Sequence, residues 1–181
     1  LKLAKDLAEA VPAPLDLEGC RSRKSDDPSA LHVFLLQEVE RYNKLLRSMS
    51  QSLRDVERGI RGLVVMSAEL DDVVSCLTVG KVPPSWGRCF PSLKPLGPWM
   101  KDVAQRVAML DAWSEGSYPR VYWMSGFSYP TGFLTALLQT AARAGGVSVD
   151  VLSWDFVVLP GYEEREAPPA PRAPRSPASH V

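Results

Sequence analysis

The stretch Leu35-Leu-Gln-Glu-Val39-Glu-Arg-Tyr42-Asn-Lys-Leu-Leu46-Arg-Ser-Met49-Ser-Gln-Ser-Leu53-Arg-Asp-Val56 carries the clearest periodicity in the sequence. Its apolar residues are spaced alternately by four and three and continue to Ile60 and Leu63, which is a heptad pattern. Charged residues, Glu38 and Arg41 among them, are assigned to the opposite, solvated face. The pattern predicts a long amphipathic helix over residues 33–58, weakened at its end by glycines.

The apolar seam of this helix has two interpretations. It could pair with a second chain in a coiled coil. It could also pack against other helices of the same module, and we favour this interpretation because more helical sequence follows at once.

Shorter helices are predicted after the long one. Ser67 is suited to cap a helix that Gly80 ends, and acidic residues lie in its first turn, where they meet the positive end of the helix dipole. A further helix is predicted over about residues 98–113. Pro130 is well placed at the first position of a last helix over residues 130–143.

Two short strands are predicted around this last helix. Residues 120–124, Arg-Val-Tyr-Trp-Met, are typical of a short buried strand, and residues 147–159 alternate in part. Strand, helix and strand would form a small α/β unit, right-handed if the strands pair in parallel. The predicted fold class is therefore mainly α, with a small α/β unit near the C-terminus.

The composition divides the sequence into four segments. Residues 1–30 are predicted to be irregular, because prolines interrupt them, and residues 31–80 to form a helical module. Residues 81–159 are predicted to hold the remaining helices and the α/β unit. Residues 160–181 are rich in Pro and Arg and poor in apolar groups, so we expect them to be disordered.

Charge and composition exclude several function classes. Lys and Arg number 21, as do Asp and Glu, so the broad basic surface of a nucleic-acid-binding protein is not expected. The longest apolar runs are too short to span a bilayer, so no membrane partner is expected. The three cysteines form no Cys-x-x-Cys pair, which argues against a zinc site and favours reduced thiols.

Catalytic motifs are not found in the sequence. Gly80-Lys81 resembles the end of a P-loop, but Ser75 replaces the first glycine and Val82 the Ser or Thr that follows Lys. The turn Ser125-Gly-Phe-Ser128 lacks the flanking glycines of a nucleophile elbow. We therefore predict no catalytic, cofactor-binding or metal-binding residue in this protein.

Large buried side chains are the remaining candidates for a functional role. The tryptophans lie on apolar stripes without interleaved basic residues, so core packing is favoured over base stacking. The predicted packing anchors are Tyr42, Leu46, Trp86, Trp99, Trp113 and Trp123.

Several motifs, in order, resemble the C-terminal region of dynein heavy chains, the motors that walk on microtubules. They are Leu36-Gln-Glu-Val-Glu-Arg-Tyr-Asn-Lys-Leu-Leu46, Lys81-Val-Pro-Pro-Ser-Trp86, Lys94-Pro-Leu-Gly-Pro-Trp99 and Val121-Tyr-Trp-Met-Ser-Gly-Phe127. The resemblance as a whole covers roughly residues 3–158. The Lys94–Trp99 motif is more similar to axonemal heavy chains than to cytoplasmic ones.

The resemblance implies a non-catalytic segment at the end of the AAA+ ring, with residues 81–159 forming an incomplete C-terminal domain. ATP would bind elsewhere in the full-length family. The implied partners are the rest of the ring and other dynein complex subunits, with microtubules reached indirectly. The implied location is cytoplasmic and cytoskeletal, in the ciliary axoneme. The missing initiator Met suggests a fragment or an incomplete gene model.

Two alternatives come from other function classes. A free-standing helical adaptor would use the heptad seam and the Pro-rich tail to bind partners. A small enzyme would use the turn at Ser125–Thr131, although the sequence offers no histidine there as a base.

Overall fold

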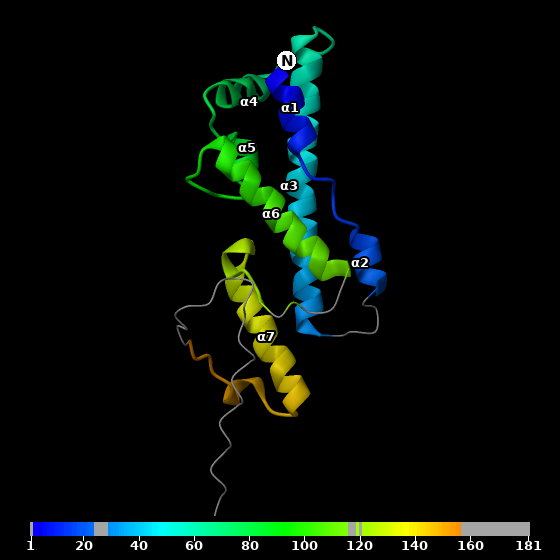
Figure 1. The fold of residues 1–181 in the computed structure, drawn as a ribbon, viewed down its shortest axis with the longest axis vertical. Helices are drawn as coiled ribbons and strands as arrows, with labels where there is room; N and C mark the ends of the chain where they lie inside the picture. Colours follow the sequence, from blue (N-terminus) through cyan, green and yellow to red (C-terminus); the bar gives the residue numbers. More distant parts are fainter. Residues whose placement is uncertain (1, 24–28, 116–118, 120, 157–181) are drawn as a thin grey trace, which may run out of the picture.

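The computed structural model describes residues 2–23, 29–115, 119 and 121–156. Its longest element is the helix α3 (Ala30–Ile60), which spans 31 residues and lies at the centre of the helical body (Figure 1). The remaining helices pack around α3. They are α1 (Lys2–Ala10), α2 (Leu17–Arg23), α4 (Ala68–Thr78), α5 (Pro84–Gly87), α6 (Leu96–Glu115) and α7 (Pro130–Gly145).

Local sequence signals explain the bounds of α3. The hydroxyl oxygen of Ser29 accepts a hydrogen bond from the His32 amide at 3.1 Å, which caps the first turn. Beyond the C-terminal end, Gly62 has a φ of +70°, a conformation that glycine adopts without strain. The predicted long helix is confirmed. Its seam is buried as far as Val56, whereas Ile60 and Leu63 are largely exposed.

The other predicted helices are also present. Ser67 caps α4 by accepting a hydrogen bond from the Leu70 amide at 3.3 Å. Pro130 occupies the first turn of α7, and Gly146, with a φ of +63°, ends it. These ends were predictable because each depends on one residue and its immediate neighbours.

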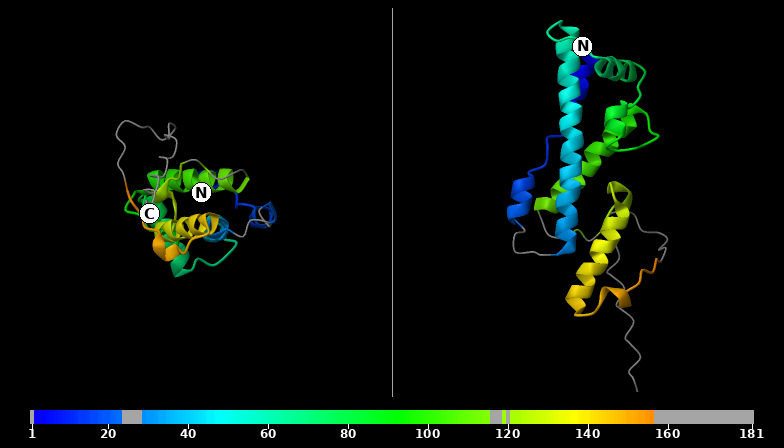
Figure 2. Two further views of the ribbon diagram at one scale, coloured as in Figure 1. Left: turned by 90° about the horizontal axis from the view of Figure 1, so that it is seen from below. Right: turned by 180° about the vertical axis from the view of Figure 1, so that it is seen from behind.

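The prediction that residues 1–30 are irregular is wrong, because this segment contains α1 and α2. Prolines 12 and 14 separate the two helices without preventing either. Asn43 of α3 holds the connection between them: its amide group donates to the Leu15 carbonyl at 2.8 Å and accepts from the Leu15 amide at 2.7 Å. Figure 2 shows α1 beside α3 in a second orientation.

The predicted strand–helix–strand unit is also wrong, since the described residues contain no strand. At the end of the first predicted strand the chain enters a 3-10 turn, η1 (Met124–Gly126), in which the Gly126 amide donates to the Trp123 carbonyl at 2.8 Å. In the second, Ser148 caps another such turn, η2 (Val149–Val151). Among the described residues, neither segment has a neighbouring strand to supply hydrogen bonds. Residues 157–159 and the tail predicted at 160–181 lie outside the described residues.

One hydrophobic cluster connects these helices. It extends from Ala4 of α1 through the buried face of α3 to Ala136 of α7. The cluster includes residues from both sides of position 80. The predicted division of the sequence at that position stays a prediction. None of the described helices is both long and apolar enough to cross a membrane.

We expect Leu46→Ala to lower the free energy of unfolding by about 2–5 kcal/mol, because Leu46 is fully buried and its truncation leaves a cavity. Leu93→Ala is the matched control, since Leu93 is fully exposed and should cost less than about 0.5 kcal/mol. Denaturant unfolding followed by circular dichroism measures both. Equal losses would contradict the buried position of Leu46.

Candidate functional site

A polar contact joins the N-terminal half of α3 to the turn that leads into α7. We call it the α3–turn joint, formed by Glu38, Arg41, Tyr42, Gly126 and Ser128. The carboxylate of Glu38 is fully buried. One of its oxygens accepts from the Ser128 amide at 2.7 Å, and the other from the Ser128 hydroxyl at 2.6 Å and from Arg41 at 2.8 Å.

These hydrogen bonds explain how a carboxylate can lie in the core. A buried charge is costly unless it is paired and its lone pairs are satisfied. Arg41 lies three residues after Glu38, on the same side of the helix, and its charged group reaches solvent. The joint therefore fixes the position of Ser128, two residues before α7 begins.

Tyr42 forms the second hydrogen bond of the joint, one helical turn after Glu38. Its hydroxyl donates to the Gly126 carbonyl at 3.0 Å. Burial raises the pKa of Tyr42 above its ordinary value of 10.0, and the guanidinium of Arg106 offsets part of this rise. A methyl group at Gly126 would lie 2.9 Å from the Trp123 ring, so the close approach of the turn needs glycine here.

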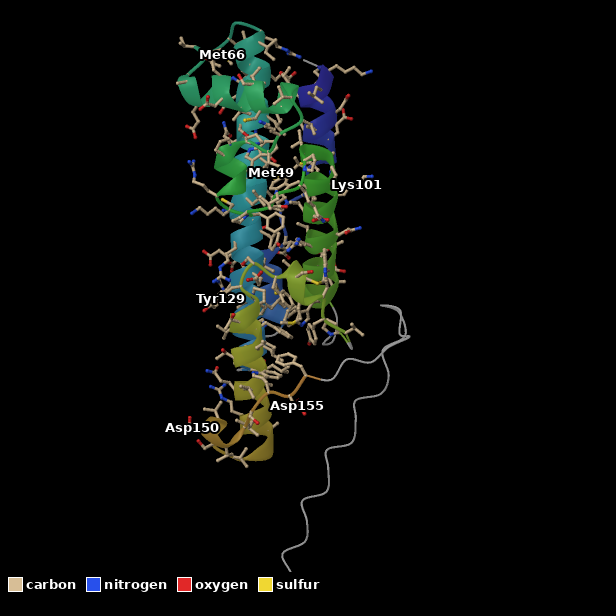
Figure 3. The ribbon with its side chains drawn as sticks, turned by 90° about the vertical axis from the view of Figure 1, so that its left-hand side faces the viewer. Met49, Met66, Lys101, Tyr129, Asp150 and Asp155 are labelled. Carbon is tan, nitrogen blue, oxygen red and sulfur yellow. The ribbon has the colours of Figure 1, made fainter. Side chains whose placement is uncertain are left out.

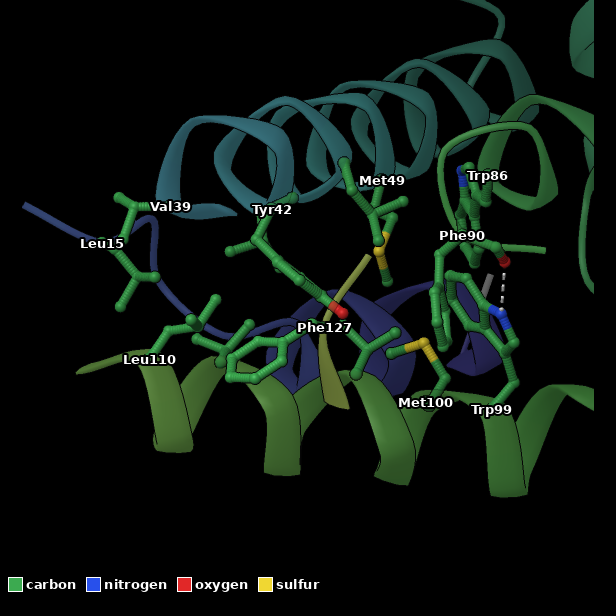
Figure 4. Close-up of a cluster of buried hydrophobic side chains, with 14 of the residues drawn as sticks. Leu15, Val39, Tyr42, Met49, Trp86, Phe90, Trp99, Met100, Leu110 and Phe127 are labelled. Carbon is green, nitrogen blue, oxygen red and sulfur yellow. Dashed lines mark hydrogen bonds between the residues drawn. The ribbon is translucent and has the colours of Figure 1, made fainter. Parts of the chain in front are cut away.

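The structure places the predicted packing anchors in two aromatic groups. Trp86 and Trp99 stack with ring centroids 6.0 Å apart, and Phe90 joins Trp99 to Tyr42 (Figure 4). Trp113 packs instead with Phe34, Phe127 and Phe133 near the start of α7.

Burial differs among the six anchors. Tyr42, Leu46 and the first three tryptophans in the sequence, Trp86, Trp99 and Trp113, are all buried, whereas Trp123 is half-buried. Their mechanical role stays a prediction.

Sequence reasoning missed Glu38 and Ser128. Glu38 was assigned to the solvated face of the long helix, and this assignment is wrong because its side chain is fully buried. The available signal was its spacing: Glu38 lies four residues before Tyr42 and therefore on the same face as a seam residue. Nothing in the local sequence pointed to Ser128 as its partner, 90 residues away.

The groups of the joint form a contact between two segments and do not match a catalytic arrangement. A serine beside a carboxylate lacks the histidine that relays the proton in a serine hydrolase. Among the described residues, no group of three or more His, Cys, Asp or Glu could hold a metal ion. The arrangement holds two segments together.

We expect Glu38→Gln to lower the free energy of unfolding by about 2–3 kcal/mol, because an amide cannot accept all three hydrogen bonds and loses the ion pair. Glu40→Gln is the control on the same helix, since Glu40 is exposed. Chemical denaturation at neutral pH compares the two. A Glu38→Gln protein as stable as the control would show that the joint contributes nothing to stability.

We expect the stability that the Tyr42 hydroxyl provides to fall as the pH rises above 10.0. The pKa of this group is raised in the folded protein, so the unfolded chain ionises first and gains free energy relative to the native state. Unfolding of wild type and Tyr42→Phe, measured from neutral to alkaline pH, should give a difference that shrinks above pH 10.0. A constant difference would contradict burial of the hydroxyl.

Known proteins similar to this one are dynein heavy chains. The family of the C-terminal domain of dynein heavy chains matches residues 1–176. The protein is 54% identical over 171 residues, 93% of its length, to the Dynein-1-beta heavy chain, flagellar inner arm I1 complex, of Chlamydomonas reinhardtii. It is 49% identical over 159 residues, 87% of its length, to Dynein axonemal heavy chain 2 of Mus musculus.

The similarity extends to Dynein axonemal heavy chain 1 of Rattus norvegicus, at 42% identity over 159 residues, again 87% of this protein. The sequence spans only 4% of the length of each of these three relatives. The resemblance seen in the sequence motifs is confirmed: this protein belongs to the family of C-terminal domains of dynein heavy chains.

Proposed function

We propose that this protein is a non-catalytic C-terminal segment of an axonemal-type dynein heavy chain, which supports the AAA+ ring during microtubule-based ciliary movement. The identity of 54% along 93% of the sequence to a flagellar inner arm heavy chain carries the proposal. The contacts of α3 with both α1 and α7 support a role in which this helix links parts of the segment.

The proposed mechanism is mechanical. A helix of 31 residues measures about 45 Å at 1.5 Å per residue, so α3 can connect distant points of a larger assembly. Close-packed protein interiors transmit displacement, because they are barely compressible. The α3–turn joint would pass the movement of α3 to α7 through Glu38 and Ser128.

The proposed partners follow from this role. They are the rest of the heavy-chain ring and the other subunits of a dynein complex, while microtubules are reached only through other parts of the motor. ATP would be bound by other modules, so this segment would not be an enzyme by itself. The proposed location is the cytoskeleton of the cilium, the axoneme, as the names of the relatives imply.

The adaptor alternative fits the fold less well. Its docking surface would be the heptad seam, yet Leu46, Met49 and Leu53 are covered by the protein's own helices. Another molecule could reach only the last two seam positions, Ile60 and Leu63.

The joint variant tests the mechanical role in the full-length motor. We expect Glu38→Gln to slow microtubule gliding relative to Glu40→Gln. A weaker contact between α3 and α7 would transmit less of the ring's movement from one helix to the other. Gliding velocity and ATP turnover are measured on the same preparations. Equal velocities for the two variants would contradict a mechanical role for this segment.

Leu46→Asp separates the motor proposal from the adaptor alternative. A buried carboxylate without partners should unfold the protein, and circular dichroism would record the loss of helix. The adaptor alternative expects instead that the wild type self-associates and that Leu46→Asp stays folded but becomes a monomer. Sedimentation of both proteins distinguishes the two results.

A further inference from the structure

A buried arginine lies beside the α3–turn joint. Arg106 of α6 is only 8% exposed. Its guanidinium lies 4.2 Å from the centre of the Phe90 ring and 4.9 Å from that of Trp123. Its Nε atom is buried without a hydrogen-bond partner, and no carboxylate among the described residues forms an ion pair with it.

Arg106 lines a cavity of about 490 Å³. This volume lies in the range of small-ligand sites in proteins. The polar side chains of the wall come from the loop before α6, from α6 itself and from the turn before α7, and they are Ser92, Lys94, Asp102, Arg106, Ser125 and Ser128.

The charges in this wall leave one positive group unbalanced. Lys94 forms an ion pair of 2.6 Å with Asp102, so these two charges cancel. Glu38 behind Ser128 is balanced by Arg41. Among the described residues of the wall, Arg106 is therefore the cation without a counter-charge, and burying such a group is costly unless a ligand supplies one.

The donor groups of the cavity suit an oxygen anion. The aromatic rings cover part of the guanidinium face, and the Tyr42 hydroxyl takes up part of its N–H edge. The remaining N–H groups are of the kind that binds carboxylate or phosphate oxygens. The oxygen of Ser92 accepts from the Lys94 amide at 3.2 Å, which leaves the Ser92 hydroxyl hydrogen for a ligand.

We propose that this cavity binds an oxyanion, a carboxylate or phosphate group, with Arg106 as its principal partner and Lys94 and Ser92 as further donors. This site goes beyond the support of the ring and does not depend on it. The anion comes either from solution or from an acidic side chain of another protein segment, and both sources present the same oxygens.

The first measurement is a titration of the 181-residue protein with inorganic phosphate and with acetate at constant ionic strength. The Arg106 Nε–H signal in a nitrogen–proton NMR spectrum should move along a saturable curve. A short Glu-containing peptide forms the second arm: tighter binding than acetate assigns the site to a protein segment, and equal binding assigns it to a free anion. A signal that does not move with any of the three overturns the proposal.

Charge variants give the second measurement without disturbing the buried arginine. We expect Asp102→Asn to tighten anion binding and Lys94→Gln to weaken it, each about threefold, because they change the charge of the wall in opposite directions. Lys101→Gln is the matched control, since Lys101 lies exposed on the same helix (Figure 3).

Opposite shifts at positions 94 and 102, with none at 101, support the site. Identical affinities in the three variants overturn it, because they would show that the anion binds elsewhere. Arg106→Gln should abolish the saturable binding. If this variant does not fold, the ion pair of Lys94 and Asp102 still decides the outcome.

Discussion

The burial of the Glu38 carboxylate constrains the rest of this fold. A charge in the core is tolerated only where donors surround it, and the donors come from Arg41 on the same helix and from Ser128, 90 residues later. The turn before α7 must therefore lie against α3, and Tyr42 meets Gly126 as a consequence. One buried side chain thus relates α3 to α7.

The predictable part of the fold is the part that local chemistry determines. The helix α4 begins after Ser67, α7 begins at Pro130, and α3 follows its heptad seam, since each signal acts over a few residues. The two predicted strands could not be tested against local signals, because a strand forms only where a neighbouring strand supplies backbone hydrogen bonds. Tyr122 illustrates the failure: its apolar surroundings reflect packing against Trp113 and Phe133, not a sheet.

The candidate site was less predictable than the fold. The six anchors were chosen by size and apolar spacing, a criterion that finds core residues and says little about polar contacts. Glu38 and Arg106 are both charged and both buried, and helix periodicity treats such residues as surface. Their surroundings come from segments distant in sequence, so only the three-dimensional structure brings the joint and the neighbouring cavity together.

Gly126 lies where three elements approach one another. Its carbonyl accepts the hydrogen bond from α3, and a side chain there would meet Met109 of α6 at 3.0 Å as well as the ring of Trp123. Evolutionary change at any of these places is therefore not independent. The end of the Met109 side chain can swing aside, but the rigid Trp123 ring cannot shrink, so a larger residue at position 126 favours a smaller one at 123, and drift in this corner of the family should proceed by paired replacements.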